Sequence, residues 1–203
     1  HSAILMEQLH GNRVATVNKS SAGAGLFSDI SRIPGSDGLV CVAPHITLIV
    51  RTADCVPLLF YDPIKQILGA AHAGWRGTVG NIAGNVITKM GTDFGTNPTD
   101  IIVAAGPCIC RDHYLVKGIG DGRVGQFRSL FGHKSSVIQQ EQDKTSIDLA
   151  EANRLLCLRQ GVNKDQIEVS PVCTYDPANA WPSYRGGDKH CKRQIWTYIT
   201  KSV

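Results

Sequence analysis

The chain has 203 residues, of which 42% are hydrophobic and 19% are charged, and its formal net charge is +4. This composition excludes a largely disordered chain and predicts one sizeable domain over residues 1–203, or two small ones, while no apolar run reaches the ~18 residues that a membrane helix needs. The mild positive charge suits an anionic small substrate, but no basic run or basic-aromatic stripe indicates nucleic-acid binding.

Apolar runs bounded by turn residues predict a set of strands. The strands are expected at Ala3–Gln8, Leu39–Val42, Ile46–Val50, Val56–Tyr61, Gln66–Ala71, Ile101–Ala105, Ile167–Val172 and Ile195–Ile199. The Asp62–Lys65 stretch between the fourth and fifth runs is favourable turn sequence. These two strands are therefore expected to form an antiparallel hairpin.

Helices are expected over Thr78–Met90, over Val124–Phe131 and from Asp148 onwards. The third is the best marked, because Asp148 and Glu151 form a capping box and Gly161 supplies a stop. Strands cluster in the first half without strict βαβ alternation. The pattern therefore predicts an α+β fold with antiparallel pairs and not a doubly wound parallel sheet.

Cys55 and His72 lie at equal distances from the centre of the predicted turn. In an antiparallel hairpin they would be cross-strand partners, with Cβ atoms roughly 4.5–5.5 Å apart. Such a pair could bind one metal ion or act as a thiolate–imidazole pair. The inference depends on register, since a one-residue bulge would turn one side chain to the other face.

Other residues near these two add to the pattern. Arg51 and Asp54 flank Cys55, and two glycines and Arg76 follow His72 before a helix start, which suits an anion but also an ordinary strand-to-helix turn. His10 closes an earlier strand-like stretch. As a third ligand it would complete a Cys/His₂ set with an open fourth position, which is typical of catalytic zinc.

The seven cysteines are odd in number and show no repeated Cys-x-x-Cys spacing. They favour a reduced, cytoplasmic setting over a disulfide scaffold. Cys41, Cys157 and Cys173 are expected in the core, and His113 has no convincing set of partners.

Six motifs occur in order along the chain. They are Gln8-Leu-His10-Gly, Thr52-Ala-Asp-Cys55-Val-Pro, Ala71-His72-Ala-Gly-Trp-Arg76-Gly-Thr, Gly106-Pro-Cys108-Ile, Asp148-Leu-Ala-Glu-Ala-Asn153-Arg and Ser183-Tyr-Arg185. Together they resemble the YfiH family of laccase-domain or polyphenol-oxidase-like proteins over the whole chain. The resemblance implies a layered α+β sandwich of mixed, largely antiparallel sheets flanked by helices, distantly similar to bacterial toxin deamidases.

The resemblance further implies that His10, Cys55 and His72 are metal ligands and the catalytic centre, with zinc or copper as the ion. Family members are described as zinc-dependent phosphorylases of adenosine, inosine and methylthioadenosine that also deaminate adenosine. The expected partners are a purine nucleoside and phosphate, and the expected state is a monomer or weak homodimer. Substrate binding is expected from Asp37, Arg51, Asp54, Arg76 and Arg185, and Asp54 is suggested as a proton shuttle.

The chain departs from the family pattern in two places. Family members carry several dozen more residues before the Gln-x-His-Gly motif, so this chain is expected to lack that N-terminal segment. The usual Phe-Phe-Ser-Tyr-Arg-Arg is Trp181-Pro-Ser-Tyr-Arg185-Gly186 here, so one of two arginines is replaced.

Other functions use the same residues. A laccase needs many more histidines, several in His-x-His pairs, whereas this chain has seven histidines and no such pair. A Cys/His₂ site accepts copper, so weak oxidase activity would be incidental. A cysteine hydrolase acting on a peptidoglycan precursor would use Cys55 as nucleophile and His72 as base. A closed structural zinc is the remaining alternative.

Overall fold

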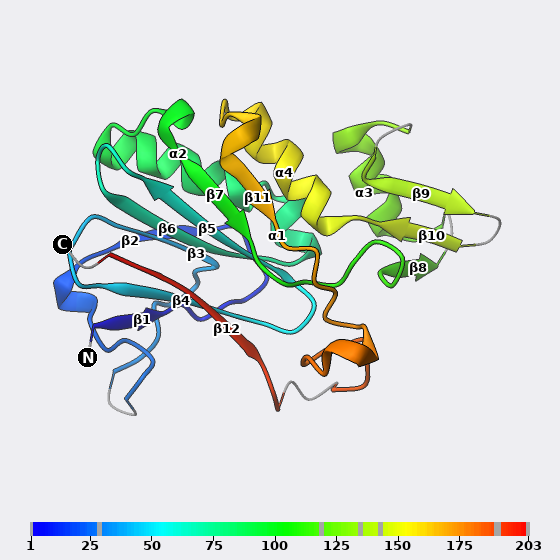
Figure 1. Cartoon of the computed structure of the whole chain (residues 1–203), viewed down its shortest axis with the longest axis horizontal. Coiled ribbons are helices and arrows are strands. Elements are labelled where there is room, and N and C mark those ends of the chain that lie inside the picture. Colours follow the sequence, from blue (N-terminus) through cyan, green and yellow to red (C-terminus); the bar gives the residue numbers. More distant parts are fainter. Residues whose placement is uncertain are drawn as a thin grey trace.

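A large central sheet organises the computed structural model, with strand order β11-β7-β5-β6-β3-β2 among the described residues (Figure 1). The structure describes residues 2–27, 30–117, 120–133, 136–141, 144–188 and 192–201. The strands of this sheet are Val14–Val17 (β2), Gly38–Cys41 (β3), Val56–Asp62 (β5), Ile67–Ala73 (β6), Ile102–Ala105 (β7) and Ile167–Val169 (β11). The pairs β2–β3 and β7–β11 are parallel, and the pairs between them are antiparallel.

Two smaller sheets accompany the central one. The second sheet has the order β1-β4-β12 and lies against one face of the central sheet. The third sheet has the order β8-β10-β9 and extends from one end of the molecule beside a helix (Figure 1). Their strands are Ala3–Leu5 (β1), Thr47–Thr52 (β4), Ile195–Thr200 (β12), Leu115–Lys117 (β8), Ile138–Glu141 (β9) and Lys144–Ile147 (β10).

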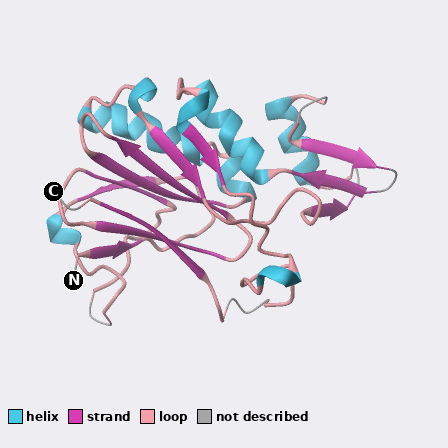
Figure 2. Cartoon of the chain, in the orientation of Figure 1, coloured by secondary structure: helices cyan, strands magenta, loops and turns pink. Residues whose placement is uncertain are grey.

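Helices cover the other face of the central sheet (Figure 2). The α-helices are Trp75–Val79 (α1), Ile82–Phe94 (α2), Gly122–Phe131 (α3) and Leu149–Arg159 (α4). Short 3₁₀ turns occupy Lys19–Ser21, Pro98–Asp100, Lys164–Gln166 and Pro177–Asn179. The layers are therefore helices, central sheet and second sheet, which confirms the expected α+β sandwich.

The alternation of side chains along β6 explains its continuous apolar sequence. Ile67 and Ala71 belong to the core beneath the helices, whereas Leu68 and Ala70 belong to the core against the second sheet. A strand buried on both faces has no polar face to present to water. The same alternation in β5 directs Leu58 to the helices.

The expected strands are confirmed, with shifted ends, and the structure adds β2, β8, β9 and β10. The predicted helix over Thr78–Met90 is wrong as one element, because it is divided between α1 and α2. The break falls at Asn81, whose φ of 59° is left-handed and whose side chain caps α2 by accepting from the Gly84 backbone N at 3.2 Å.

Half of the predicted capping box is formed. The Asp148 side chain accepts from the Glu151 backbone N at 2.9 Å. The Glu151 carboxylate does not accept from the Asp148 backbone N, as a full capping box requires. It pairs instead with Arg154 at 2.6 Å, and the Asp148 backbone N donates to the Val137 backbone oxygen. Gly161, with a φ of 96°, ends α4 as expected.

Among the described residues, no helix combines the length and apolar character needed to cross a membrane.

Candidate active site

The hairpin of β5 and β6 is confirmed, but the expected register is wrong by two residues. His72 pairs with Pro57, and the last pair joins Asp62 to Ile67, so the loop contains four residues. Cys55 therefore lies diagonally from His72 and not directly opposite it. Since the partner of each residue moved by two positions, both side chains stay on the same face.

His10 joins Cys55 and His72 at this end of the sheet. One ligand atom from each residue lies within 4.8 Å of the others. The two imidazole rings meet edge to face with centroids 4.7 Å apart. His72 is buried, Cys55 is half-buried and His10 is exposed. A thiolate and two imidazoles in this arrangement suit zinc or copper.

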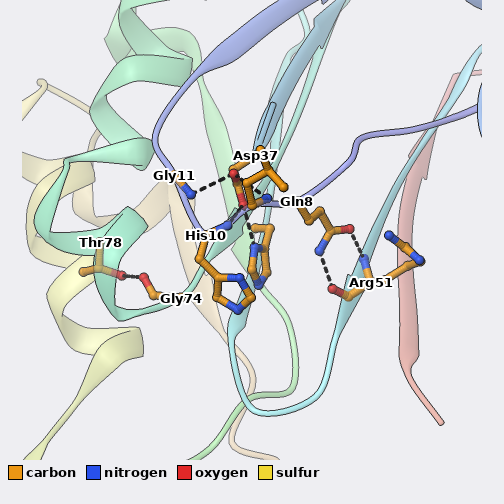
Figure 3. Close-up of polar contacts among 9 residues, drawn as sticks. Gln8, His10, Gly11, Asp37, Arg51, Gly74 and Thr78 are labelled. Carbon is orange, nitrogen blue, oxygen red and sulfur yellow. Dashed lines mark hydrogen bonds and ion pairs between the residues drawn. The ribbon is translucent and has the colours of Figure 1, made fainter. Parts of the chain in front are cut away.

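The loop that carries His10 is held by Asp37. The Asp37 carboxylate accepts from the backbone N of Leu9 at 3.0 Å, of His10 at 2.9 Å and of Gly11 at 2.8 Å (Figure 3). His10 has a left-handed φ of 62°, a conformation that a non-glycine residue adopts only when its surroundings hold it there. The three bonds supply that constraint.

Gln8 fixes the start of the same loop. Its side chain donates to the Arg51 oxygen at 2.6 Å and accepts from the Arg51 backbone N at 3.0 Å (Figure 3). These two bonds tie the loop to β4, a strand of the second sheet. His10 therefore reaches the end of β6 from a different layer of the fold.

Asp37 also orients His72. Gly38 pairs with Ala71 in the β3–β6 ladder, so the preceding Asp37 lies beside His72, and its carboxylate is 2.8 Å from His72 Nδ1. Burial acts to lower the pKa of His72, but the bond to Asp37 and the contact with Cys55 outweigh it and raise the pKa to about 9. A proton on Nδ1 leaves Nε2 as the metal-binding atom.

Asp37 is fully buried and is not among the residues that line the adjacent pocket. Its carboxylate lies beneath the site, bonded to the His10 loop and to His72, and the substrate contact expected from the sequence stays a prediction. Burial acts to raise the pKa of its carboxyl, but the bonds from His72 and from the backbone of Gly11 lower it overall.

Cys55 is poised as a thiolate. Burial acts to raise the pKa of its thiol, but hydrogen bonds from His10 and His72 and the charges on these rings lower the pKa to about 7. A thiolate near neutral pH is both a metal ligand and a nucleophile. Its geometry alone is compatible with either role.

Gly74 allows the three residues to converge. A Cβ at this position would lie 3.0 Å from Cys55 Sγ and 3.1 Å from His10 Cδ2. The Gly74 oxygen accepts from Thr78 Oγ1 at 3.0 Å, and Asn153 of α4 donates to the same hydroxyl at 2.9 Å. The glycine two residues after His72 thus serves close packing, and α4 supports the turn.

The cluster opens into a pocket of about 480 Å³. Four of the expected substrate-binding residues line it: Arg51, Asp54, Arg76 and Arg185. Side chains that the sequence did not single out also line it, among them Glu7, Trp75, Tyr114, Arg123 and Tyr184. Trp75 and Tyr184 stand inside the quoted motifs and could have been named, whereas Tyr114 and Arg123 carry no motif signal.

The pocket is rich in arginine. Among the described residues, the buried Nε of Arg51 has no hydrogen-bond partner. The Arg76 guanidinium lies 4.5 Å from the centre of the Trp75 ring. Arg185 lies 5.0 Å from the centre of the Tyr114 ring. Guanidinium groups of this kind bind phosphate or carboxylate.

Asp54 anchors one wall of the pocket. Its carboxylate accepts from Thr174 Oγ1 at 2.8 Å and from the Arg185 backbone N at 2.7 Å, so both oxygens hold the segment before β12. Its left-handed φ of 87° marks the sharp turn between β4 and β5. Both carboxylate oxygens are thus hydrogen-bonded, and the proton-shuttle role suggested from the sequence stays a prediction.

Comparison with known proteins identifies related chains. A family model described as multi-copper polyphenol oxidoreductase laccase matches residues 1–200. Purine nucleoside phosphorylase YlmD of Bacillus subtilis (strain 168) is 33% identical over 186 residues, which are 91% of this chain and 66% of that protein. Adenosine deaminase RL5, from an unknown prokaryotic organism, is 33% identical over 84% of this chain and 64% of its own length.

Solved structures agree with this relationship. YlmD from Geobacillus stearothermophilus superposes with a TM-score of 0.91 and 34% identity, covering 100% of this chain and 74% of that one. The YfiH protein of Bacillus licheniformis gives a TM-score of 0.91 and 30% identity. The chain spans slightly less than two thirds of the two sequence relatives' own length.

Proposed function

Since the chain belongs to the multi-copper polyphenol oxidoreductase laccase family, which includes YfiH and YlmD proteins, we propose that it is a metal-dependent purine nucleoside phosphorylase. Its substrates would be adenosine, inosine and methylthioadenosine, and it would also deaminate adenosine. The observation that carries this proposal is the convergence of His10, Cys55 and His72 at a pocket lined by several arginines.

His10, Cys55 and His72 would hold the metal ion, and the donor set fits zinc better than a hard cation. The buried Asp37 beside His72 provides the partner that metal-bound imidazoles commonly have. Three protein ligands leave one position open. A zinc ion there would act as a Lewis acid or activate water.

The remaining lining residues suit a nucleoside and an anion. A volume of about 480 Å³ lies in the usual range for small-molecule sites. The unpaired Arg51 Nε, together with Arg76, offers positive charge for phosphate. The exposed Tyr184 ring offers a flat surface for a purine.

In phosphorolysis, a phosphate oxygen forms a bond to C1′ of the ribose while the bond from C1′ to N9 breaks. The electron pair of the broken bond stays on the purine, which takes up a proton. The arginines would align phosphate with the sugar and hold its charge in place during the displacement.

The test is nucleoside turnover by protein of measured metal content. We expect hypoxanthine release from inosine only when inorganic phosphate is present, with ribose 1-phosphate as co-product. Cys55→Ala and His72→Ala should lose both metal and turnover. Cys41→Ala, which alters a buried thiol of β3 outside the pocket lining, should retain both. Unchanged inosine turnover in Cys55→Ala would refute the assignment.

Deamination gives a separate readout. It replaces the 6-amino group of adenosine with oxygen from water and releases ammonia without phosphate. Phosphate-independent ammonia release with no free base would make deamination the main activity. A relative named adenosine deaminase supports including this reaction.

A cysteine hydrolase is the alternative that the geometry favours most after phosphorolysis. The thiol of Cys55 has a lowered pKa and contacts His72, as a nucleophile–base pair requires. A stoichiometric metal ion would occupy the thiolate and exclude this mechanism. The same metal measurement therefore separates the two proposals.

A further inference from the structure

Cys110, His113 and Cys173 form a second group of sulfur and nitrogen donors outside the lining of the pocket. His113 Nδ1 lies 3.2 Å from Cys110 Sγ and 3.4 Å from Cys173 Sγ. One ligand atom from each lies within 4.8 Å of the others. The sequence assigned Cys173 to the core and found no partners for His113, so this grouping emerges only from the fold.

Two loops from neighbouring strands build the cluster. Cys110 and His113 lie three residues apart in the turn after β7, where the Cys110 oxygen accepts from the backbone N of His113 at 3.2 Å and of Tyr114 at 3.0 Å. Cys173 follows β11, the parallel neighbour of β7. Parallel strands end at the same edge, so their loops meet there.

The spacing of the donors matches tetrahedral zinc. With Zn–S bonds of about 2.3 Å and Zn–N bonds of about 2.0 Å, the edge between nitrogen and sulfur is about 3.5 Å. Both observed separations from His113 Nδ1 are close to this value. A single ring nitrogen aimed at two sulfurs is the arrangement expected when all three atoms face a shared ion.

The surroundings fix the donors in place. The His113 ring stacks on Tyr175, with centroids 4.6 Å apart and planes 29° from parallel. The Cys110 backbone N donates to Cys173 Sγ at 3.3 Å, and Asn179 Nδ2 donates to the Cys173 oxygen at 3.0 Å. The bond to Sγ stabilises the Cys173 thiolate, and the bond from Asn179 fixes the backbone that carries it.

We propose that Cys110, His113 and Cys173 bind a second zinc ion that fastens the loop after β7 to the loop after β11. Two thiolates and one imidazole form a soft donor set that selects zinc over magnesium or calcium. His113 is exposed and Cys110 is half-buried, so water can complete the coordination.

This ion would support one wall of the pocket. The backbone N–H of Ile109, next to Cys110, donates to the Asp54 backbone oxygen at 3.0 Å. Thr174, next to Cys173, donates its hydroxyl to the Asp54 carboxylate at 2.8 Å. Loss of the second ion should therefore loosen the residues around Asp54 while leaving the ligands of the first site intact.

The test counts metal in the full chain, purified under reducing conditions and loaded with zinc. We expect two zinc ions per chain in the wild type. One zinc ion should remain in Cys55→Ala, and one should remain in the double variant that combines Cys110→Ser and Cys173→Ser. His113→Ala should also lose one ion, whereas His45→Ala, which removes another exposed histidine, should lose none.

Cobalt(II) provides a second readout that does not depend on the cluster variants folding. In Cys55→Ala the only thiolates that we propose as ligands belong to Cys110 and Cys173, so intense sulfur-to-cobalt charge-transfer absorption is expected. Absence of this absorption together with no bound zinc in Cys55→Ala would overturn the proposal. A Cys110–Cys173 disulfide in the reduced preparation would overturn it as well. Neither result depends on nucleoside turnover, so failure of the proposed function would be distinguishable.

Discussion

At the residue scale, Asp37 shows how a side chain outside the pocket can govern it. Its carboxylate binds three consecutive backbone N–H groups of the His10 loop and also His72 Nδ1. One residue thus sets the positions of two proposed ligands that come from different layers. The sequence named Asp37 as a substrate-binding residue but gave no sign of the direction of its side chain.

Asp37→Asn should weaken metal binding about 10–100-fold, the usual effect of altering the partner of a metal-bound histidine. An amide cannot accept all four bonds as a charged carboxylate does, so His72 and the His10 loop should both lose orientation. Asp93→Asn, which alters an exposed carboxylate of α2 that pairs with Lys89, is the control. Zinc titration measures the change, and equal affinity in Asp37→Asn and the wild type would contradict the role.

The same substitution predicts a pH dependence for metal-free protein. The pKa of Asp37 is lowered from 3.8 on folding, so its contribution to stability is present above that pH and is lost as the pH falls. The pKa of His72 is raised from 6.5 to about 9, so its contribution is complete below pH 6.5 and is lost as the pH rises through about 9. The difference in free energy of unfolding between wild type and Asp37→Asn should therefore be largest between about pH 4 and 6.5. Urea unfolding across this range measures it, and a difference that grows above pH 9 would contradict the pairing.

At the scale of elements, the sequence located the hairpin but misplaced its register. Apolar periodicity and turn residues identify two strands, but they do not fix whether the loop contains two or four residues. The loop here is four residues long because Asp62, at the end of β5, accepts from the backbone N of Ile64 at 2.8 Å and of Lys65 at 2.9 Å. The position of His10 was harder to predict, because its loop comes from the β1-β4-β12 sheet and meets β6 only in the folded chain.

Asn81 separates α1, which carries Trp75 and Arg76 into the pocket, from α2. Asn81→Ala should reduce the free energy of unfolding by about 1–2 kcal/mol, because alanine loses the cap and is disfavoured at positive φ. Asn81→Gly should cost only a few tenths of a kcal/mol, since glycine tolerates the conformation. Denaturant unfolding of both variants measures this, and equal destabilisation would show that the left-handed conformation is not important.

At the scale of the whole molecule, the pocket is assembled from parts that are distant in sequence. The strand ends at Cys55 and His72 form the floor of the pocket. The region around the β8-β10-β9 sheet contributes Tyr114, just before β8, and Arg123 of α3. The segment before β12 supplies Tyr184 and Arg185. The motifs predicted Cys55 and His72 in the floor, because few residue types have the chemistry of these proposed metal ligands. The walls were predicted in part: Arg51, Arg76 and Arg185 were named from the sequence, whereas Tyr114 and Arg123 lie in no quoted motif.

Thr174→Val tests whether the bond to Asp54 holds the wall in place. The variant keeps the shape of the side chain but leaves a buried carboxylate oxygen without its partner, which should cost about 1–3 kcal/mol of stability. Because Arg185 is bonded to the other oxygen of Asp54, we expect a higher KM for nucleoside with a smaller change in kcat.

Thr174→Ser keeps the hydroxyl, so its KM should lie close to the wild-type value. If the methyl group had a purely steric role, Thr174→Ser would instead be impaired and Thr174→Val would be normal. Zinc content should stay at the wild-type value in both variants, because neither substitution removes a proposed ligand. A raised KM with unchanged metal content would therefore assign the effect to the wall and not to the metal centre. An unchanged KM in a destabilised Thr174→Val would instead confine the Asp54–Thr174 bond to folding.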